Sequence, residues 1–519
     1  MGISKFFVMA VIAGMVGSAQ AAPPNIVYIL ADDMGPGDVS AYNTAGKIPT
    51  PHIDRIAQEG VRFTDAHSNA SICTPTRYGT MTGRYTWRTP RKEGVVGGYT
   101  PLMIQPGRMT VSLFLKEQGY RTACVGKWHM GLDWALKPGA KGMKGKKIPG
   151  KFVDLTRPIT RGPLDVGFDY FFGLTGSMNM FPYAFIDGRN LQGTLEYLPD
   201  MDAVNARGFE GAKPGWGAKE FDREKTLGIL TKKACSWIRQ NAEKPFFLYF
   251  PLTSPHSPIV PSENFKGKSG LNGHGDYVLE TDWAVGQVLK TLDELNLAEN
   301  TLVVFTSDNG TSPQAGLKTM QAKGHFTEMQ YRGLKGTTWE GGHRVPFVVR
   351  WPAGAKRGIV SEQLICSTDL LATCNALLGK TLPADAGEDS VSFLPALKGE
   401  KIPGNSSRMI VHHSDKGFFA VRKGKWKLLL DDRGGSSRKN PKDQPVVNAE
   451  EILLFDMELD EEESTNLSRQ YPEVVMQMKK ELASLIRTGR STPGAAQPTD
   501  YADPSVKWKQ LAPIREYLK

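Results

Sequence analysis

The sequence contains little cysteine and lacks internal repeats, and we find no transmembrane helix in it. Of its 519 residues only five are cysteine, namely Cys73, Cys124, Cys235, Cys366 and Cys374, too few for a disulfide scaffold. Setting Cys73 apart leaves four, which allow three pairings. Because Cys124, Cys235 and Cys374 fall in predicted strands or helices, we expect buried free thiols instead.

Signatures of nucleic-acid binding are also missing. The formal net charge is +10, yet the chain has neither zinc-finger spacing nor an aromatic-rich RNA motif. A basic surface would equally attract an anionic polysaccharide over long range. The densest basic run, 137–151, is rich in Gly and Pro and is therefore predicted to be a loop, either solvated or at the rim of an anionic ligand site.

The N-terminus carries the one strongly apolar segment. Lys5 precedes an apolar stretch over 6–17, and Ala19-Gln20-Ala21 provides an Ala-x-Ala cleavage site. This pattern is typical of a secretory signal peptide, and Pro23-Pro24 argues against a buried helix at this point. We expect cleavage after Ala21 and a periplasmic or secreted mature protein.

Apolar β-branched runs alternate with amphipathic stretches from the mature N-terminus to about residue 378. This alternation predicts an α/β sheet with helices on both faces. We expect strands at 25–31, 120–126, 245–250, 301–306, 345–350 and 362–366, and helices at 110–118, 227–238, 281–297 and 369–378.

The pattern changes near residue 400. Segments 418–422 and 425–430 read as a hairpin, and 452–455 as a third strand. Pro472 then opens a helix with one apolar face. We therefore divide the chain into a signal peptide (1–21), an N-terminal domain (22–400) and a C-terminal subdomain (401–519) made of a small antiparallel sheet and a covering helix.

Polar side chains follow four of the predicted strands. They are Asp32, Asp33, Lys127, His129, His256, Asp308 and Asn309. In doubly wound sheets the ligand site lies beyond the carboxyl ends of the strands, so we expect these residues to meet. The Asp and Asn side chains offer only oxygen, which Ca²⁺ or Mg²⁺ prefers over zinc. Taken singly, each such pair is more often a helix cap or a turn.

The segment around Cys73 predicts an oxyanion site. Pro75 favours a first helical turn, so Cys73 would lie at a helix N-terminus, where free N–H groups favour an anion. Arg77 is one turn further on. Gly79 would allow close packing. The simpler interpretation is a buried cysteine in a helical turn.

These residues carry a family resemblance. The order Cys73-x-Pro75-x-Arg77, followed by 82–84 (Thr-Gly-Arg), resembles the signature of the type I sulfatases, although Thr76 and Met81 replace the usual serine and leucine. Further segments resemble that family in the correct order, namely 126–131 (Gly-Lys-Trp-His-Met-Gly), 255–258 (Pro-His-Ser-Pro) and 333–342 with Lys335. The resemblance implies an alkaline-phosphatase-like α/β sandwich, with a large, mixed, mostly parallel sheet between helices and a smaller C-terminal antiparallel sheet.

The resemblance also implies a mechanism. A maturation enzyme would convert Cys73 to Cα-formylglycine, whose hydrate is the nucleophile. One Ca²⁺ would be held by Asp32, Asp33, Asp308, Asn309 and residue 73. Lys127 and Lys335 would bind the sulfuryl oxygens, and Arg77 would hold the formylglycine hydrate, a geminal diol. Asp308 would accept a proton from this diol, and His256 would protonate the leaving group. His129 would position the diol and aid the release of sulfate.

The substrate is a separate hypothesis. Segments 173–183 and 339–346 look like those of arylsulfatase A-type and N-acetylgalactosamine-6-sulfatase-like enzymes, although Asn179 stands where relatives often place an acidic residue. His413, with His412, would lie at the pocket rim and bind substrate, or else be an ordinary surface residue. We expect an exported sulfatase acting on galactose- or N-acetylgalactosamine-type sulfated glycans, with O6 as the candidate position. The alternatives are a formylglycine-dependent phosphonate or phosphodiester hydrolase and, if Cys73 stays unmodified, a non-catalytic glycan binder.

Overall fold

A ten-stranded mixed sheet forms the centre of the protein. The structure is a computed structural model that describes residues 22–140, 148–206, 212–500 and 508–518. The strand order is β13-β2-β12-β11-β1-β10-β4-β5-β6-β7. The strands are β1 (Asn25–Asp32), β2 (Val61–Phe63), β4 (Arg121–Lys127), β5 (Tyr170–Leu174), β6 (Ile186–Asp187), β7 (Asn190–Leu191), β10 (Phe246–Pro255), β11 (Thr301–Ser307), β12 (Phe347–Arg350) and β13 (Ile359–Ser361). Strands β11, β1, β10, β4 and β5 are parallel, whereas β12 is antiparallel to β11 and β2.

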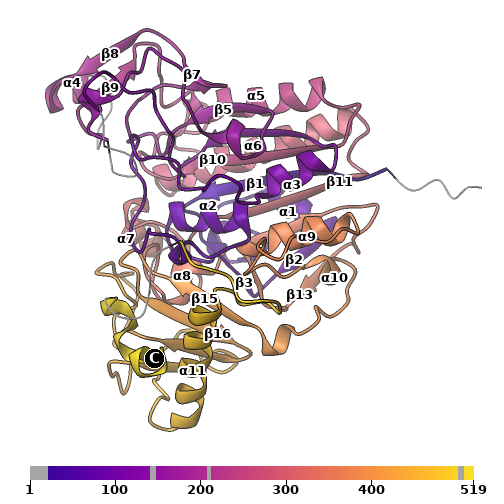
Figure 1. The fold of residues 1–519 in the computed structure, drawn as a ribbon, viewed down its shortest axis with the longest axis vertical. Coiled ribbons are helices and arrows are strands. Elements are labelled where there is room, and N and C mark those ends of the chain that lie inside the picture. Colours follow the sequence, from indigo (N-terminus) through magenta and orange to yellow (C-terminus); the bar gives the residue numbers. More distant parts are fainter. Residues whose placement is uncertain (1–21, 141–147, 207–211, 501–507, 519) are drawn as a thin grey trace, which may run out of the picture.

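Helices cover both faces of this sheet (Figure 1). Alternate β1 residues point to opposite sides. Val27 and Ile29 pack with α1 (Pro51–Gln58), α5 (Thr226–Gln240) and α6 (Gly273–Glu294). Ile26, Tyr28 and Leu30 pack with α2 (Cys73–Thr82), α3 (Val111–Glu117) and α9 (Leu370–Leu377). Because both faces are covered, β1 is buried throughout.

Most predicted helix boundaries lie within a few residues of the observed ones. Thr110 caps α3 as expected, since its side chain accepts a hydrogen bond from the Leu113 N–H. The prediction for α6 was wrong at its start. The helix begins at Gly273 rather than Thr281, because the Asn272 side chain caps it by accepting from the Gly275 N–H.

A four-stranded antiparallel sheet lies at the C-terminal end of the molecule, at the bottom of Figure 1. It contains β15 (Met409–His413), β16 (Phe419–Lys423), β17 (Trp426–Leu429) and β18 (Leu453–Asp456), and α11 (Pro472–Thr488) covers it. Its apolar layer includes Met478 and Leu482 of α11 together with Tyr85 and Trp87 of the N-terminal part. The sequence analysis predicted the last three strands and α11 but not β15.

Short elements complete the fold. They are β3 (Ala66–His67), paired with β14 (Ile365–Cys366), β8 (Leu195–Leu198), paired with β9 (Gly215–Ala218), and the helices α4 (Met201–Ala206), α7 (Leu317–Ala322), α8 (Glu340–His343) and α10 (Leu394–Leu397). The predicted strand at 362–366 is reduced to β14 and leaves the main sheet. This architecture confirms the expected α/β class with a second, smaller antiparallel sheet.

All five cysteines are buried and free, which confirms the expectation for Cys124, Cys235 and Cys374. In the part of the chain that the structure describes, no helix combines the length and apolarity needed to cross a bilayer. The predicted signal peptide, residues 1–21, lies outside the described residues, as does part of the basic run, 141–147.

Candidate active site

Helix α2 places Cys73 at its first turn. Ile72 precedes it in an extended conformation, and Cys73 is only 2% exposed. The helix packs closely on the preceding loop, since a Cβ at Gly79 would lie 2.3 Å from the Asn69 Oδ1. This close approach is the reason for a glycine at that position, as the sequence predicted.

Carboxylates from the ends of β1 and β11 meet next to Cys73. The Asp33 N–H donates to the Asp308 Oδ1 at 3.2 Å, and the Asn309 Nδ2 donates to the Asp33 Oδ1 at 2.8 Å. Asp33 has a φ of 69°, the left-handed region that non-glycine residues rarely adopt. Such conformations concentrate at functional sites. The two predicted oxygen-bearing pairs therefore form one cluster.

Three buried cations bind these carboxylates. The Lys127 Nζ lies 2.6 Å from the Asp32 Oδ2, and the Lys335 Nζ lies 2.5 and 2.7 Å from the two Asp33 oxygens. The Arg77 guanidinium contacts the Asp308 Oδ2 at 2.7 Å and the Asp32 Oδ1 at 3.4 Å. Arg77 also donates to the Lys127 carbonyl at 3.1 Å. The sequence predicted all three cations.

The two predicted histidines occupy different positions. The Thr74 hydroxyl donates to the His129 carbonyl at 2.9 Å, and the His129 Nε2 lies 3.1 Å from the Val96 carbonyl. His129 has a φ of 56°. The His256 Nε2 lies 3.6 Å from the Asp33 Oδ2 and 3.4 Å from the Ser177 hydroxyl. His129 thus supports the start of α2 through Thr74, while His256 faces the carboxylate cluster directly.

The electrostatic environment favours an anion at residue 73. Burial alone would raise the pKa of the Cys73 thiol, but Lys127 and Lys335 hold it below its ordinary value. Burial raises the pKa of Asp308 to about 7, although Arg77 opposes this rise. Burial, with Lys127 and Arg77, lowers the pKa of His129 well below its usual range. His129 is therefore neutral, and Asp308 can exchange a proton near neutral pH.

The cluster suits a hard divalent cation. Ligand atoms of Asp32, Asp33, Cys73 and His256 all lie within 4.8 Å of one another. The Asp32 Oδ1, which lies 3.4 Å from the Arg77 guanidinium, and the Asn309 Oδ1 are buried, and neither accepts a hydrogen bond from the described residues. Buried oxygens left in this way are costly unless they meet a donor or a cation. The Asp32 and Asp33 carboxylates offer the oxygen ligands that Ca²⁺ prefers.

His413 differs from the other predicted residues. Its backbone carbonyl accepts from the Ser71 N–H at 2.9 Å, two residues before Cys73. Its imidazole, however, is buried against the Phe419 ring, and burial lowers its pKa to about 3. A direct contact of His413 with substrate stays a prediction that this burial does not favour.

Sequence reasoning missed two residues of the site. Ser177 contacts His256, and Thr74 links Cys73's helix to His129. Neither carries a local signal, because a lone Ser or Thr is common everywhere and both contacts depend on tertiary structure.

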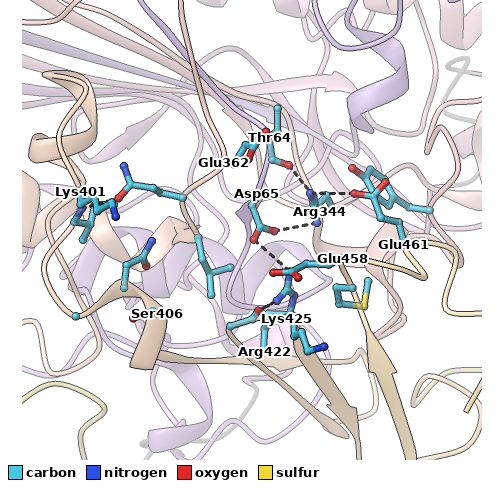
Figure 2. A pocket seen from close by; sticks show the side chains of 18 of the residues that line it. Thr64, Asp65, Arg344, Glu362, Lys401, Ser406, Arg422, Lys425, Glu458 and Glu461 are labelled. Atoms are coloured by element: carbon cyan, nitrogen blue, oxygen red, sulfur yellow. Dashed lines mark hydrogen bonds and ion pairs between the residues drawn. The ribbon is translucent and has the colours of Figure 1, made fainter. Parts of the chain in front are cut away.

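A cavity of about 940 Å³ lies outside this cluster (Figure 2). Thr64 and Asp65, Arg344, Glu362, and Arg422 of the C-terminal sheet contribute to its walls. None of the site residues described above lines it. We therefore place the candidate active site at Cys73 and not in this cavity.

Comparisons with known proteins point in one direction. The sequence profile of the sulfatase family matches residues 24–380. An N-acetylgalactosamine-6-O-sulfatase of Bacteroides thetaiotaomicron is 35% identical over 504 residues, covering 89% of this chain and 93% of the relative. Human arylsulfatase A is 32% identical over 497 residues, covering 92% of this chain and 90% of the relative.

Solved structures agree with the sequence matches. A structure from work on glycosaminoglycan metabolism by Bacteroides thetaiotaomicron has a TM-score of 0.77 and 33% identity, covering 90% of this chain and 100% of that chain. A phosphonate monoester hydrolase of Agrobacterium radiobacter has a TM-score of 0.57 at 18% identity, covering 89% of this chain and 95% of that chain, a likeness of fold alone. The alkaline-phosphatase-like arrangement expected from the sequence is confirmed.

Proposed function

We propose, from the premise that the chain belongs to the sulfatase family, that it removes sulfate from galactose- or N-acetylgalactosamine-type glycans, with O6 as the position. Hydrolysis of sulfuric esters is the activity of that family. The observation that carries the proposal is the convergence of Lys127, Lys335 and Arg77 on Cys73 at the ends of the parallel strands.

The proposed nucleophile is residue 73. We propose that a maturation enzyme oxidises Cys73 to formylglycine, whose hydrate supplies the attacking oxygen. Asp32, Asp33, Asp308 and Asn309 would hold a Ca²⁺, which when bound neutralises charge on the sulfate oxygens. The buried Asn309 Oδ1, which has no hydrogen-bond partner among the described residues, supports this ligand set.

Each of the remaining side chains has its own proposed catalytic role. Lys127 and Lys335 would bind the sulfuryl oxygens, and both are buried, where a fixed positive charge acts more strongly than in water. Arg77 would orient the residue-73 oxygens, and Asp308 would accept a proton from them. His256 would give a proton to the departing sugar oxygen as the S–O bond breaks, and Ser177 would orient its ring.

Two observations support the proposed sugar. The relative with 35% identity is named for N-acetylgalactosamine 6-O-sulfate, and the net charge of +10 would attract a polyanionic glycan.

We also propose export after cleavage at Ala21, and a boundary between the N-terminal domain and the C-terminal subdomain near residue 400. N-terminal sequencing of the mature protein would test the cleavage site.

One experiment tests the chemistry directly. Mass spectrometry of the tryptic peptide 63–77 should show the thiol sulfur and two hydrogens replaced by oxygen. Cys73→Ala should abolish sulfate release from 4-nitrophenyl sulfate while its circular dichroism stays that of the wild type. An unmodified thiol in an active enzyme, or wild-type turnover by Cys73→Ala, would refute the proposed nucleophile.

A second assay tests the substrate. Sulfate release should be compared across galactose and N-acetylgalactosamine carrying sulfate at O3, O4 or O6. The 6-O-sulfates should give the highest kcat/KM. Activity confined to aryl sulfates would defeat the substrate proposal while leaving the reaction class intact.

A further inference from the structure

Three histidine rings meet between the central sheet and the C-terminal sheet. His67 lies on β3, His343 ends α8, and His412 lies on β15, and all three are fully buried. The His67 Nδ1 is 3.0 Å from the His343 Nδ1. The His343 and His412 rings stack with centroids 3.7 Å apart. One ligand nitrogen from each ring lies within 4.8 Å of the other two. We call this group the histidine cluster.

The outer nitrogen of each ring is already engaged. These contacts run from the His67 Nε2 to the Asp65 Oδ1 at 2.8 Å, from the His343 Nε2 to the Thr338 carbonyl at 3.1 Å, and from the His412 Nδ1 to the Ser68 carbonyl at 3.1 Å. Carboxylate and carbonyl oxygens only accept, so each of these nitrogens carries the proton. In a neutral ring the other nitrogen is then a bare lone pair. A ligating histidine typically donates its second N–H in this way.

The nitrogens that face the inside of the cluster carry no proton. They are the His67 Nδ1, the His343 Nδ1 and the His412 Nε2. Two lone pairs 3.0 Å apart, on His67 and His343, repel unless a proton or a cation lies between them. Burial lowers the pKa of His67, and lowers those of His343 and His412 well below the ordinary value, which disfavours a proton. Among the described residues, the His412 Nε2 has no hydrogen-bond partner. A cation resolves both features.

We propose that His67, His343 and His412 bind a Zn²⁺ ion through the Nδ1, Nδ1 and Nε2 atoms, respectively, with water in the fourth position. Neutral imidazole suits zinc, whereas Ca²⁺ and Mg²⁺ prefer oxygen. Two nitrogens on one tetrahedral zinc lie roughly 3.3 Å apart, given Zn–N bonds of about 2.0–2.1 Å, close to the 3.0 Å between His67 and His343. Binding by all three would tilt the stacked rings of His343 and His412, now 7° from parallel.

The charged side chains around the histidine cluster are joined in buried ion pairs. Lys427 contacts Glu340 at 2.9 Å and Glu463 at 2.7 Å. Arg344 contacts both Asp65 and Glu340 at 2.9 Å. Figure 2 shows Asp65 between Arg344 and Arg422 on the wall of the large cavity. Asp65 also accepts a hydrogen bond from His67. The Asp65 side chain therefore lies between this cavity and the histidine cluster.

The proposed ion would join parts of the chain that are far apart in sequence. His412 precedes His413, whose carbonyl accepts from the Ser71 N–H beside the nucleophile. His343 follows Gly342, whose carbonyl accepts from the Gly310 N–H beside Asn309. The zinc would therefore fix the C-terminal sheet against the two loops that carry the nucleophile and a calcium ligand. This role is independent of the chemistry at residue 73.

The test is metal analysis of the full-length mature protein after incubation with Zn²⁺ and desalting. Wild type and Cys73→Ala should each retain roughly one zinc per chain. His343→Gln and His412→Ala should lose it, whereas His52→Ala, a matched change outside the cluster, should keep it. Asp65→Asn should weaken zinc binding about 10- to 100-fold through loss of His67 positioning. X-ray absorption at the zinc edge of the wild type should show three nitrogen ligands.

Two results would overturn the proposal. The first is wild-type protein that retains no zinc. The second is zinc retained equally by His412→Ala, which would mark adventitious binding elsewhere. If the cluster variants do not fold, the wild-type zinc-edge spectrum decides alone, and a spectrum dominated by oxygen ligands refutes the site.

Discussion

Replacing Lys335 by methionine separates the electrostatic role of this residue from its catalytic one. The Lys335 Nζ lies 2.5 and 2.7 Å from the Asp33 oxygens, and both side chains are buried. Methionine keeps the length and apolar stem but removes the charge, so the Asp33 carboxylate loses its closest cationic partner. Removing one partner of a buried ion pair costs roughly 3–5 kcal/mol. We expect a loss of that size in the free energy of unfolding when calcium is chelated.

Calcium should reduce this loss. A bound divalent cation replaces the missing ammonium next to Asp33, so the gap between wild type and Lys335→Met should shrink when Ca²⁺ is added in excess. Activity should not recover, because the sulfuryl clamp is gone. Loss of one preorganised donor to a developing charge typically lowers kcat by about 10²–10³.

The assay is urea unfolding with EDTA and with Ca²⁺, followed by turnover of 4-nitrophenyl sulfate. Lys318→Met, a change at an exposed lysine on α7, is the matched control and should leave both quantities unchanged. The reasoning is refuted if Lys335→Met is as stable as wild type in EDTA, or if its kcat stays within tenfold of wild type.

Three further outcomes are expected. Chelation should abolish turnover and lower Tm, and Ca²⁺ at about 100 times its Kd should restore about 2.7 kcal/mol of stability; turnover unaffected by EDTA would contradict the calcium site. His274 and His325 offset the burial of Asp38 and lower its pKa to about 2. The ionised Asp38 carboxylate therefore stabilises the folded protein above pH 3.8, and this stabilisation is lost as the pH falls toward 2. Asp38→Asn should therefore cost roughly 2 kcal/mol at pH 7 in urea unfolding, with the difference from wild type narrowing below pH 4; a pH-independent difference would contradict this. A Cβ at Gly310 would lie 1.8 Å from a backbone oxygen, so Gly310→Ala should displace Asn309's loop and weaken Ca²⁺ binding measured by calorimetry, whereas Gly228→Ala, with none of the described atoms within 4 Å of the new Cβ, should not.

Strand ends explain why much of the site could be predicted. Asp32, Lys127 and Asp308 each lie at the end of a strongly apolar strand, and parallel strands deliver their carboxyl ends to one edge. The apolar runs predict the strands, and the strands in turn predict where the polar residues that follow them lie. Cys73 and Arg77 could be placed because Pro75, in the first turn of α2, is a local signal for a helix start.

The histidine cluster had no comparable signal. His67 sits on a two-residue strand and His343 ends a four-residue helix, and such short elements show no periodicity. His412 lies on β15, which sequence analysis did not predict. His413 was expected at the rim of the pocket, but the packing of β15 against β16 buries its ring. Burial of this kind depends on which sheet faces which, and a single sequence does not encode that locally.

The backbone hydrogen bonds around residue 73 limit when the proposed oxidation of Cys73 could occur. The Gly336 N–H donates to the Ser71 carbonyl, and the Ser71 N–H donates to the His413 carbonyl, so this pocket closes only after the ribosome has made more than 400 residues. If Cys73 is oxidised as proposed, the oxidising enzyme would have to act on the nascent or unfolded chain, because residue 73 is buried in the folded protein.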